Sequence, residues 1–186
     1  MAQEYKLIFT GSMGAGKTTA IAAISEIAPI KTEVANTDRQ AHSKEQTTVA
    51  MDYGEVQLEN GDRLRLYGTP GQERFRFMWD ILQQGALGVI ILVDNTQSEP
   101  IATMKHYVHS FKKLVSCDRA VVGVGRMDEN PHPSLEDFSQ ALEEEGLDVP
   151  VFAVDIRKGD DVLLMLDVLM NRIEVWEMLN QLEAQA

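Results

Sequence analysis

Eight consecutive residues near the N-terminus carry the most specific chemical signal in the sequence. They match the pattern G-x-x-x-x-G-K-[ST], as Gly11, Ser12, Met13, Gly14, Ala15, Gly16, Lys17 and Thr18. Glycines at this spacing let successive backbone N–H groups curl around a phosphate at the start of a helix. A lysine in this place reaches the β- and γ-phosphates of a nucleoside triphosphate, and the hydroxyl after it ligates Mg²⁺. We predict a triphosphate site here, formed with the adjacent Thr19, in which Lys17 has a catalytic role and Thr18 binds the metal.

The chain on either side of this loop must supply a strand and a helix. Residues 5–10 (YKLIFT) are rich in strand formers and run directly into the glycines, and residues 17–27 have a helical pattern that ends near Pro29. Three later apolar runs are typical of strands covered on both faces, at residues 88–93, 120–124 and 149–154. Helical patterns separate or follow them, at about residues 75–86, 99–115, 134–145 and 160–183.

The remaining strands form a predicted hairpin. Residues 47–58 and 63–67 alternate in polarity and are joined through Asn60-Gly61-Asp62, a tight-turn sequence. Because strands that alternate with helices lie parallel, we predict a three-layer α/β sandwich with a mostly parallel sheet and one antiparallel edge hairpin. A length of 186 residues predicts a single domain over 1–186. Residues 30–46 show no periodicity and are predicted to be a long loop, which in a compact domain is usually functional.

Composition limits the partners and the location. Lysine and arginine number 17 against 29 acidic residues, a net charge of −12, which disfavours nucleic acid and anionic membranes as partners. Cys117 is the single cysteine, so no intramolecular disulfide is possible. The N-terminus has no signal-peptide pattern, lipidation motifs are lacking, and no apolar run approaches the roughly 18 residues of a membrane span. We expect a cytoplasmic protein without a direct membrane anchor.

Four further segments follow or begin predicted strands. They are TTVA at 47–50, GTPGQERF at 68–75, GRMD at 125–128 and DIR at 155–157. With the phosphate loop, their order and spacing resemble the five nucleotide-binding boxes of the Ras-like small GTPases over nearly the whole chain. The T-P-G-Q sequence is similar to the bacterial MglA-type group. The runs TTVAMDYG and GTPGQERFRFMWD look closest to its relatives encoded in actinobacterial conservon operons beside roadblock-type proteins.

The resemblance implies a P-loop NTPase (Ras-like) fold and a signalling switch that binds GTP or GDP with Mg²⁺ and hydrolyses GTP slowly. It implies that Thr48 ligates Mg²⁺ and senses the γ-phosphate, ordering the 30–48 loop in the triphosphate state. Gly71 would donate its backbone N–H to the γ-phosphate, and Gln72 would orient the attacking water as a catalytic residue. It further implies a roadblock-type partner that couples to the switch and an effector that the sequence does not identify.

The base site follows the family less closely. Asp128 would accept hydrogen bonds from guanine, and the backbone N–H of Ile156 would meet guanine O6. The usual Asn-Lys of this box is replaced by Gly125-Arg126, and we expect the planar guanidinium of Arg126 to lie along the base. Asp155 and Ile156 take the places of Ser and Ala in the fifth box, where both remain candidate nucleotide-binding residues.

The third box differs from the family's usual sequence at a position that takes part in metal binding. The family's usual aspartate is Gly68 in this chain, so metal binding rests on Thr18, Thr48 and the phosphates. Asp94, which ends the neighbouring strand, either substitutes for that aspartate or caps the following turn. For charge compensation during hydrolysis, Arg39 and Arg74 are candidates for an internal arginine finger, with a surface role as the alternative for each.

Three functions are compatible with these motifs. The first is a regulatory GTPase, and the second is a nucleotide-binding pseudo-GTPase scaffold with little or no hydrolysis, suggested by Gly68 and Gly125. A P-loop kinase is the third, but the chain shows no arginine-rich lid. Two apolar faces are candidates for protein contacts or for a homodimer. One is the switch segment at 75–82, where several apolar residues should be accessible, and the other is a second apolar stripe on the last helix, at Leu164, Val168, Val175, Met178 and Leu182.

Overall fold

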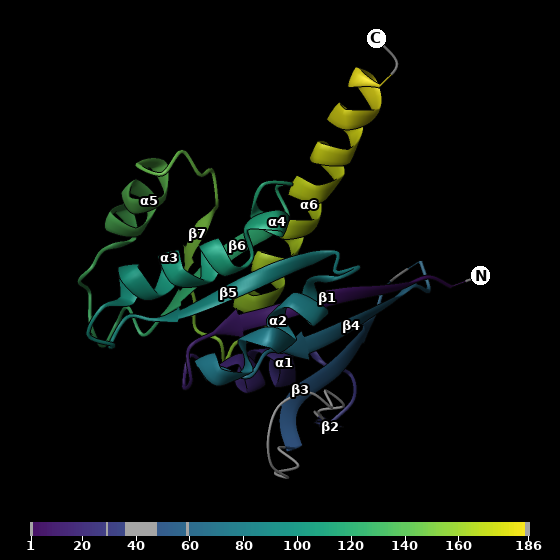
Figure 1. Cartoon of the computed structure of the whole chain (residues 1–186), viewed down its shortest axis with the longest axis horizontal. Helices are drawn as coiled ribbons and strands as arrows, with labels where there is room; N and C mark the ends of the chain where they lie inside the picture. Colours follow the sequence, from purple (N-terminus) through teal and green to yellow (C-terminus); the bar gives the residue numbers. More distant parts are fainter. Residues whose placement is uncertain (1, 29, 36–47, 59, 185–186) are drawn as a thin grey trace, which may run out of the picture.

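A seven-stranded sheet forms the centre of the molecule, in the strand order β2-β3-β4-β1-β5-β6-β7 (Figure 1). The computed structural model describes residues 2–28, 30–35, 48–58 and 60–184, except for the side chains of 31–35, 48–50 and Glu73. The strands are β1 (Glu4–Gly11), β2 (Ile30–Ala35), β3 (Thr48–Gln57), β4 (Arg63–Gly68), β5 (Gly88–Asp94), β6 (Ala120–Gly125) and β7 (Val151–Ala153).

The five strands from β4 to β7 in this order pair in parallel, and β3 is antiparallel to both of its neighbours. The predicted fold class is therefore confirmed, with one more strand than the sequence pattern indicated. Ile30–Ala35, predicted to belong to a loop, form β2 and pair with β3 from Ile30↔Tyr53 to Ala35↔Thr48. The prediction was wrong because β2 takes its backbone partners from the outer edge of β3, and local periodicity does not report such pairing. The rest of the predicted loop lies outside the described residues.

Helices cover both faces of the sheet, which gives the three predicted layers. Helices α1 (Lys17–Ile24) and α6 (Gly159–Glu183) share one hydrophobic core with the first face. The other face packs against α2 (Arg76–Gln83), α3 (Pro100–Ser110), α4 (Lys112–Val115) and α5 (Leu135–Glu143). Every residue of β5 is buried, as expected for a strand covered on both sides.

Helix α1 ends at Ile24, three residues before its predicted end. The Ser25 hydroxyl donates to the carbonyl of Ile27 at 2.8 Å and accepts from the backbone N–H of Glu55 at 3.1 Å. These contacts turn the chain out of the helix and tie it to β3. They illustrate how serine competes with helical hydrogen bonds by bonding the nearby backbone.

Helix α2, which follows a short 3₁₀ turn at Glu73–Phe75, is attached to the core at both ends. At its C-terminal end, the Lys6 ammonium on β1 donates to the carbonyls of Leu82 at 3.2 Å and Gln84 at 2.6 Å. Nearer its beginning, Trp79 is buried, and its indole N–H donates to the carbonyl of Pro70 at 3.1 Å. The loop before α2 is thus connected to a side chain that is fixed in the core.

Helix α6 has 25 residues and extends well past the body of the molecule (Figure 1). Its buried residues lie on one stripe, at Val162, Met165, Leu166, Leu169 and Ile173. Beyond Glu177 the helical residues are all exposed. Within the described parts of the chain, none of the helices has the length and apolar character needed to cross a membrane.

Candidate nucleotide-binding site

The phosphate loop lies between β1 and α1, as predicted. Gly16 is the N-cap residue of α1 and has φ of +93°, a conformation that favours glycine. A Cβ atom there would also fall 1.7 Å from Ile156 Cδ1, so only glycine allows Ile156 to pack on the loop. No side chain among the described residues caps this helix end, which leaves its first N–H groups directed at an incoming anion.

Lys17 is buried within the loop. Its ammonium donates to the carbonyls of Gly11 and Ser12, at 2.8 Å each. Burial lowers the pKa of Lys17 from 10.5 to about 8, and the nearby carboxylate of Asp52 partly opposes this shift. At neutral pH the lysine is still protonated, so it presents a poorly solvated positive charge to the phosphate pocket.

Asp52 is a site residue that the sequence reasoning missed. Strand register pairs it with Gly68, the position where the family's usual aspartate is lacking. Its Oδ2 accepts a hydrogen bond from the Thr18 hydroxyl at 2.6 Å. A Cβ atom on Gly68 would lie 3.0 Å from Asp52 Cβ, so the glycine makes room for this carboxylate. The carboxylate at this place is therefore supplied by β3, the strand adjacent to β4.

The Asp52 carboxylate lines a pocket of about 560 Å³ together with Lys17, Thr18, Gly71 and Gln72. A Cβ atom on Gly71 would approach the backbone nitrogen of Met13 to 2.6 Å, so glycine permits close contact between the two loops. Thr48 is the first residue of β3, four positions before Asp52, and its side chain lies outside the described part of the chain. Arg74 also lines this pocket, whereas Arg39 lies outside the described residues.

The donor set in this pocket fits Mg²⁺. The ion prefers oxygen ligands, usually one or two carboxylates together with phosphates and waters. The Thr18 hydroxyl and the Asp52 carboxylate supply such oxygens side by side. A carboxylate next to a triphosphate is also repelled unless a cation lies between them. The residues therefore fit a divalent cation, which Thr18 and Asp52 would hold and which would neutralise charge on a bound triphosphate.

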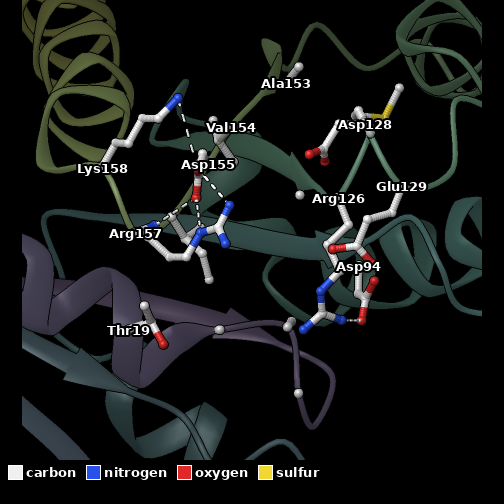
Figure 2. Close-up of a pocket in the computed structure, with 16 residues that line it drawn as sticks. Thr19, Asp94, Arg126, Asp128, Glu129, Ala153, Val154, Asp155, Arg157 and Lys158 are labelled. Carbon is white, nitrogen blue, oxygen red and sulfur yellow. Dashed lines mark hydrogen bonds and ion pairs between the residues drawn. The ribbon is translucent and has the colours of Figure 1, made fainter.

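A second pocket of about 610 Å³ shares Gly14, Gly16 and Thr19 with the first and opens on the other side of the phosphate loop (Figure 2). Its lining brings together the residues predicted to meet the base, which are Arg126, Asp128, Asp155 and Ile156. Asp128 is exposed at its edge. Taken together, the two pockets can hold a base at one end and a chain of phosphates at the other.

Asp94 at the end of β5 and Arg126 directly after β6 form an ion pair. The Asp94 carboxylate is buried at the end of β5, where it accepts from the Thr96 backbone N–H at 3.0 Å and pairs with the Arg126 guanidinium (Figure 2). It therefore caps the turn after β5, and Asp52 is the carboxylate beside Thr18. The Arg126 guanidinium is directed to Asp94 because a buried carboxylate requires a partner, and its placement along the base stays a prediction.

Asn95 is a second residue that the motifs did not reveal. It is fully buried, and its amide donates to the carbonyls of Asn130 at 2.6 Å and Pro133 at 3.0 Å. In return, the Asn130 amide donates to the Asn95 carbonyl at 2.8 Å. The backbone N–H of Asn95 also donates to the Gly125 carbonyl at 3.1 Å. These bonds hold the loop that carries Asp128. The loop has Gly125 where the family usually has an asparagine, so the support comes from Asn95.

Asp155 is engaged by the residues that follow it. The Arg157 guanidinium donates to both of its carboxylate oxygens, at 2.7 and 2.9 Å (Figure 2). These hydrogen bonds and the neighbouring positive charges hold the pKa of Asp155 at about 2, so it is ionised at neutral pH. Its backbone N–H donates to Asp161 at 2.8 Å, which secures the loop on the first turn of α6.

The switch segment exposes part of its apolar surface, as predicted. Met78, Trp79 and Leu82 are buried, whereas Phe77 is 44% exposed and Ile81 is 61% exposed. Phe77 and Ile81 are four residues apart and share one face of α2. That face begins beside the phosphate pocket, whose lining includes Phe75.

Comparisons with known proteins agree with this arrangement. The sequence model of a family described as "Conserved hypothetical ATP binding protein" matches residues 9–145. Ras-related protein RabC from Dictyostelium discoideum is 25% identical over 91% of this chain and 84% of its own length. Ras-related protein Rab-27A from Rattus norvegicus is 25% identical over 91% of this chain and 80% of its own. Ras-related protein Rab-27B from Homo sapiens is 26% identical over 91% of this chain and 81% of its own length. The chain therefore belongs to the family that the matching sequence model describes, and its distant homology to the Rab proteins supports a Ras-like small GTPase.

Proposed function

We propose that the protein is a GTP- and GDP-binding switch that hydrolyses GTP slowly, with Mg²⁺ as cofactor. The observation that carries the proposal is the Thr18–Asp52 hydrogen bond beside buried Lys17, which places metal ligands and a phosphate-binding cation in one pocket. Thr18, Asp52 and Thr48 would hold the ion, which neutralises charge on the phosphates when bound. Asp52 also removes one of the two reasons for a pseudo-GTPase, because the carboxylate absent at Gly68 has a replacement.

The choice of guanine rests on Asp128. Guanine presents N–H donors at N1 and N2, which a carboxylate accepts, whereas adenine presents a lone pair at N1 that a carboxylate repels. The family description names ATP, so the choice between the two bases needs a direct test. The test is to measure how well GTP, GDP and ATP each displace a fluorescent GDP analogue, with and without Mg²⁺. We expect guanine nucleotides to compete and ATP to fail; equal competition by ATP would contradict the guanine assignment.

We predict that Asp52→Asn lowers the Mg²⁺ affinity of the nucleotide complex by about 10- to 100-fold. The amide keeps the shape of the carboxylate but loses the charge that attracts the ion. The measurement is the release rate of a fluorescent GDP analogue as a function of free Mg²⁺. In EDTA the variant should bind nucleotide as tightly as the wild type or more tightly, because the repulsion between Asp52 and the phosphates is gone.

Asp80→Asn is the matched control, since Asp80 is an exposed carboxylate on α2. It should leave the Mg²⁺ dependence unchanged. An unchanged Mg²⁺ dependence in Asp52→Asn would remove Asp52 from the metal site. A loss of binding in EDTA would instead indicate damage to the fold.

Hydrolysis is assigned to Gln72, which lines the phosphate pocket and is exposed. We predict that Gln72→Leu lowers the single-turnover rate of GTP hydrolysis at least about tenfold, because the attacking water loses its orienting group. GTP affinity should change little, since the side chain acts on the water. Gln84→Leu, at the far end of α2, serves as the control. An unchanged rate would exclude Gln72 from the mechanism, and no turnover in the wild type would favour the scaffold function.

We further propose membership of the MglA-type group and coupling to a roadblock-type protein. The exposed Phe77 and Ile81 support the coupling, because they lie on α2, which directly follows Phe75 in the lining of the pocket that holds Gln72. The single cysteine supports a reducing, cytoplasmic location, and the high net negative charge disfavours nucleic acid and anionic membranes as partners. Binding of a purified roadblock-type dimer to the GTP and GDP forms, measured by calorimetry, would test the coupling.

A further inference from the structure

Asp128, the residue assigned to guanine, depends on its loop for its position. Its side chain is exposed at the edge of the base pocket, and its carboxylate forms no hydrogen bond or ion pair with another described residue. Hydrogen bonds weaken steeply when donor and acceptor are misaligned. A carboxylate that must meet two guanine donors at once therefore needs a loop that is held in place.

That loop is tied to one buried residue, Asn95, on both sides of Asp128. Ahead of Asp128, the Gly125 carbonyl accepts from the Asn95 backbone N–H at 3.1 Å. Beyond it, the carbonyls of Asn130 and Pro133 accept from the Asn95 amide at 2.6 and 3.0 Å, and the Asn130 amide donates to the Asn95 carbonyl at 2.8 Å. Four hydrogen bonds to a single residue thus enclose the segment that carries the carboxylate.

The segment between these attachments is a closed turn. The backbone N–H groups of Glu129 and Asn130 both donate to the Arg126 carbonyl, at 3.2 and 3.0 Å. The Arg126 guanidinium pairs with Asp94, the last residue of β5, and the next residue is Asn95. Two consecutive residues at the end of β5 therefore hold the first and the last residue of the turn, with the carboxylate midway between them.

The amide of Asn95 lies where an apolar side chain would normally pack. Asn95 is fully buried directly after a buried strand, and its side-chain oxygen has no hydrogen-bond partner among the described residues. Because an unpaired buried oxygen costs free energy, core packing does not account for the asparagine. Its amide donors do, since without them the carbonyls of Asn130 and Pro133 would lose a partner.

We propose that Asn95 is a positioning residue for guanine specificity, which holds the turn at 126–130 so that Asp128 meets both donors of the base. This role rests on the proposed function, in which Asp128 accepts from guanine N1 and N2. Asn95 itself lines neither pocket, so it acts through Asp128. Loosening the turn should lower the preference for guanine more than the affinity for a triphosphate, because the phosphates are bound by a different loop.

The ratio of the affinities for GTP and inosine triphosphate tests this role. Inosine lacks only the 2-amino group of guanine, so the ratio reports the hydrogen bond from N2 to Asp128 while the ribose and phosphate contacts cancel. Both affinities are measured by displacement of a fluorescent GDP analogue. We expect the wild type to favour GTP by at least about tenfold, and Asn95→Ala to lower this ratio by about three- to tenfold. A merely structural loss would weaken both nucleotides equally and leave the ratio unchanged.

Asn130→Ala is a milder second variant, because Asn130 is half-buried and its backbone carbonyl still accepts from Asn95. The substitution removes only the amide that donates to the Asn95 carbonyl, and the ratio should fall by about threefold. In an Asp128→Ala background the same substitution should leave the ratio unchanged, because the group that the turn positions is absent. Asn180→Ala is the control and should keep the wild-type ratio, since Asn180 is exposed on α6 and its amide donates to the Trp176 carbonyl at 2.7 Å.

The outcomes separate this role from the guanine assignment. A wild-type ratio near one, or a ratio that Asp128→Ala leaves unchanged, would overturn both. A high ratio that depends on Asp128 but stays the same in Asn130→Ala, with a wild-type melting curve, would overturn the role of Asn95 alone. A fall in Asn130→Ala that persists in the Asp128→Ala background would also overturn it, because the asparagines would then act through another group.

Discussion

Replacing Lys17 with Ala is expected to weaken GTP and GDP binding by at least about 30-fold, since losing one partner of a desolvated charge pair costs about 2–5 kcal/mol and 1.4 kcal/mol is a factor of ten. The Lys17 ammonium is held between the carbonyls of Gly11 and Ser12, where burial keeps its pKa near 8. A triphosphate adds negative charge beside the ammonium, beyond that of the nearby Asp52 carboxylate, so binding recovers energy that burial had cost. Isothermal titration of the nucleotide-free proteins measures the loss.

The same pKa shift separates a binding defect from a folding defect. The folded protein binds the Lys17 proton more weakly than the unfolded chain, so the charged lysine destabilises the free protein below about pH 8. That cost disappears as the pH rises toward 10.5. The nucleotide-free Ala variant should therefore melt no lower than the wild type at neutral pH, and higher if the relief of this cost exceeds the loss of the two hydrogen bonds. Lys113→Ala, an exposed lysine on α4, is the control for both measurements. Retained affinity in Lys17→Ala would refute the phosphate-site assignment.

The second large effect is expected at the base. Asp128→Asn should shift the preference from GTP toward xanthosine triphosphate by at least about 100-fold, because each unpaired polar group in the site costs about 1–3 kcal/mol. Xanthine carries a carbonyl at C2 where guanine carries an amino group. The asparagine amide donates to that carbonyl, and it cannot accept from both guanine donors as the carboxylate does. Competition against a fluorescent GDP analogue measures the ratio of the two affinities.

Glu129→Gln supplies the matched control, because Glu129 is the adjacent exposed acid in the same pocket. Glu129→Gln removes one negative charge, as Asp128→Asn does, but leaves Asp128 in place. It should therefore leave the preference for GTP unchanged. If Asp128→Asn binds xanthosine triphosphate no better than the wild type does, Asp128 does not read the base. A similar shift in both variants would mean that only the net charge of the pocket matters.

Local signals were enough to predict the phosphate loop and the alternation of strands and helices. The loop is defined by eight adjacent residues, and the buried strands by continuous apolar runs. Helix ends were less accurate because they depend on distant partners, as Ser25 shows by bonding to Glu55 on β3. The extent of a single domain over 1–186 stays a prediction.

The proposed metal site was only half predictable, because part of it depends on strand pairing. Nothing near Gly68 in the sequence indicates that a carboxylate sixteen residues earlier, at Asp52, lies beside it. The two positions become neighbours only through the β3–β4 register. A possible signal was an aspartate in the middle of a predicted strand, four residues after Thr48, since aspartate is depleted in strands. Asn95 was hidden for a similar reason, because its partners Asn130 and Pro133 lie on another loop.

The attachment of α2 through Lys6 determines how movement at the phosphates would propagate. Because β1 holds the carbonyls of Leu82 and Gln84, the C-terminal end of α2 acts as a pivot. The eight residues of α2 make a lever about 12 Å long, so a displacement of 1 Å at its beginning corresponds to a rotation of about 5°. Phe77, one residue from the moving end, travels farther than Ile81, which lies close to the pivot. If the loop that carries Gln72 shifted, the exposed face of α2 would tilt, and a partner bound to that face would meet Phe77 and Ile81 at a changed angle.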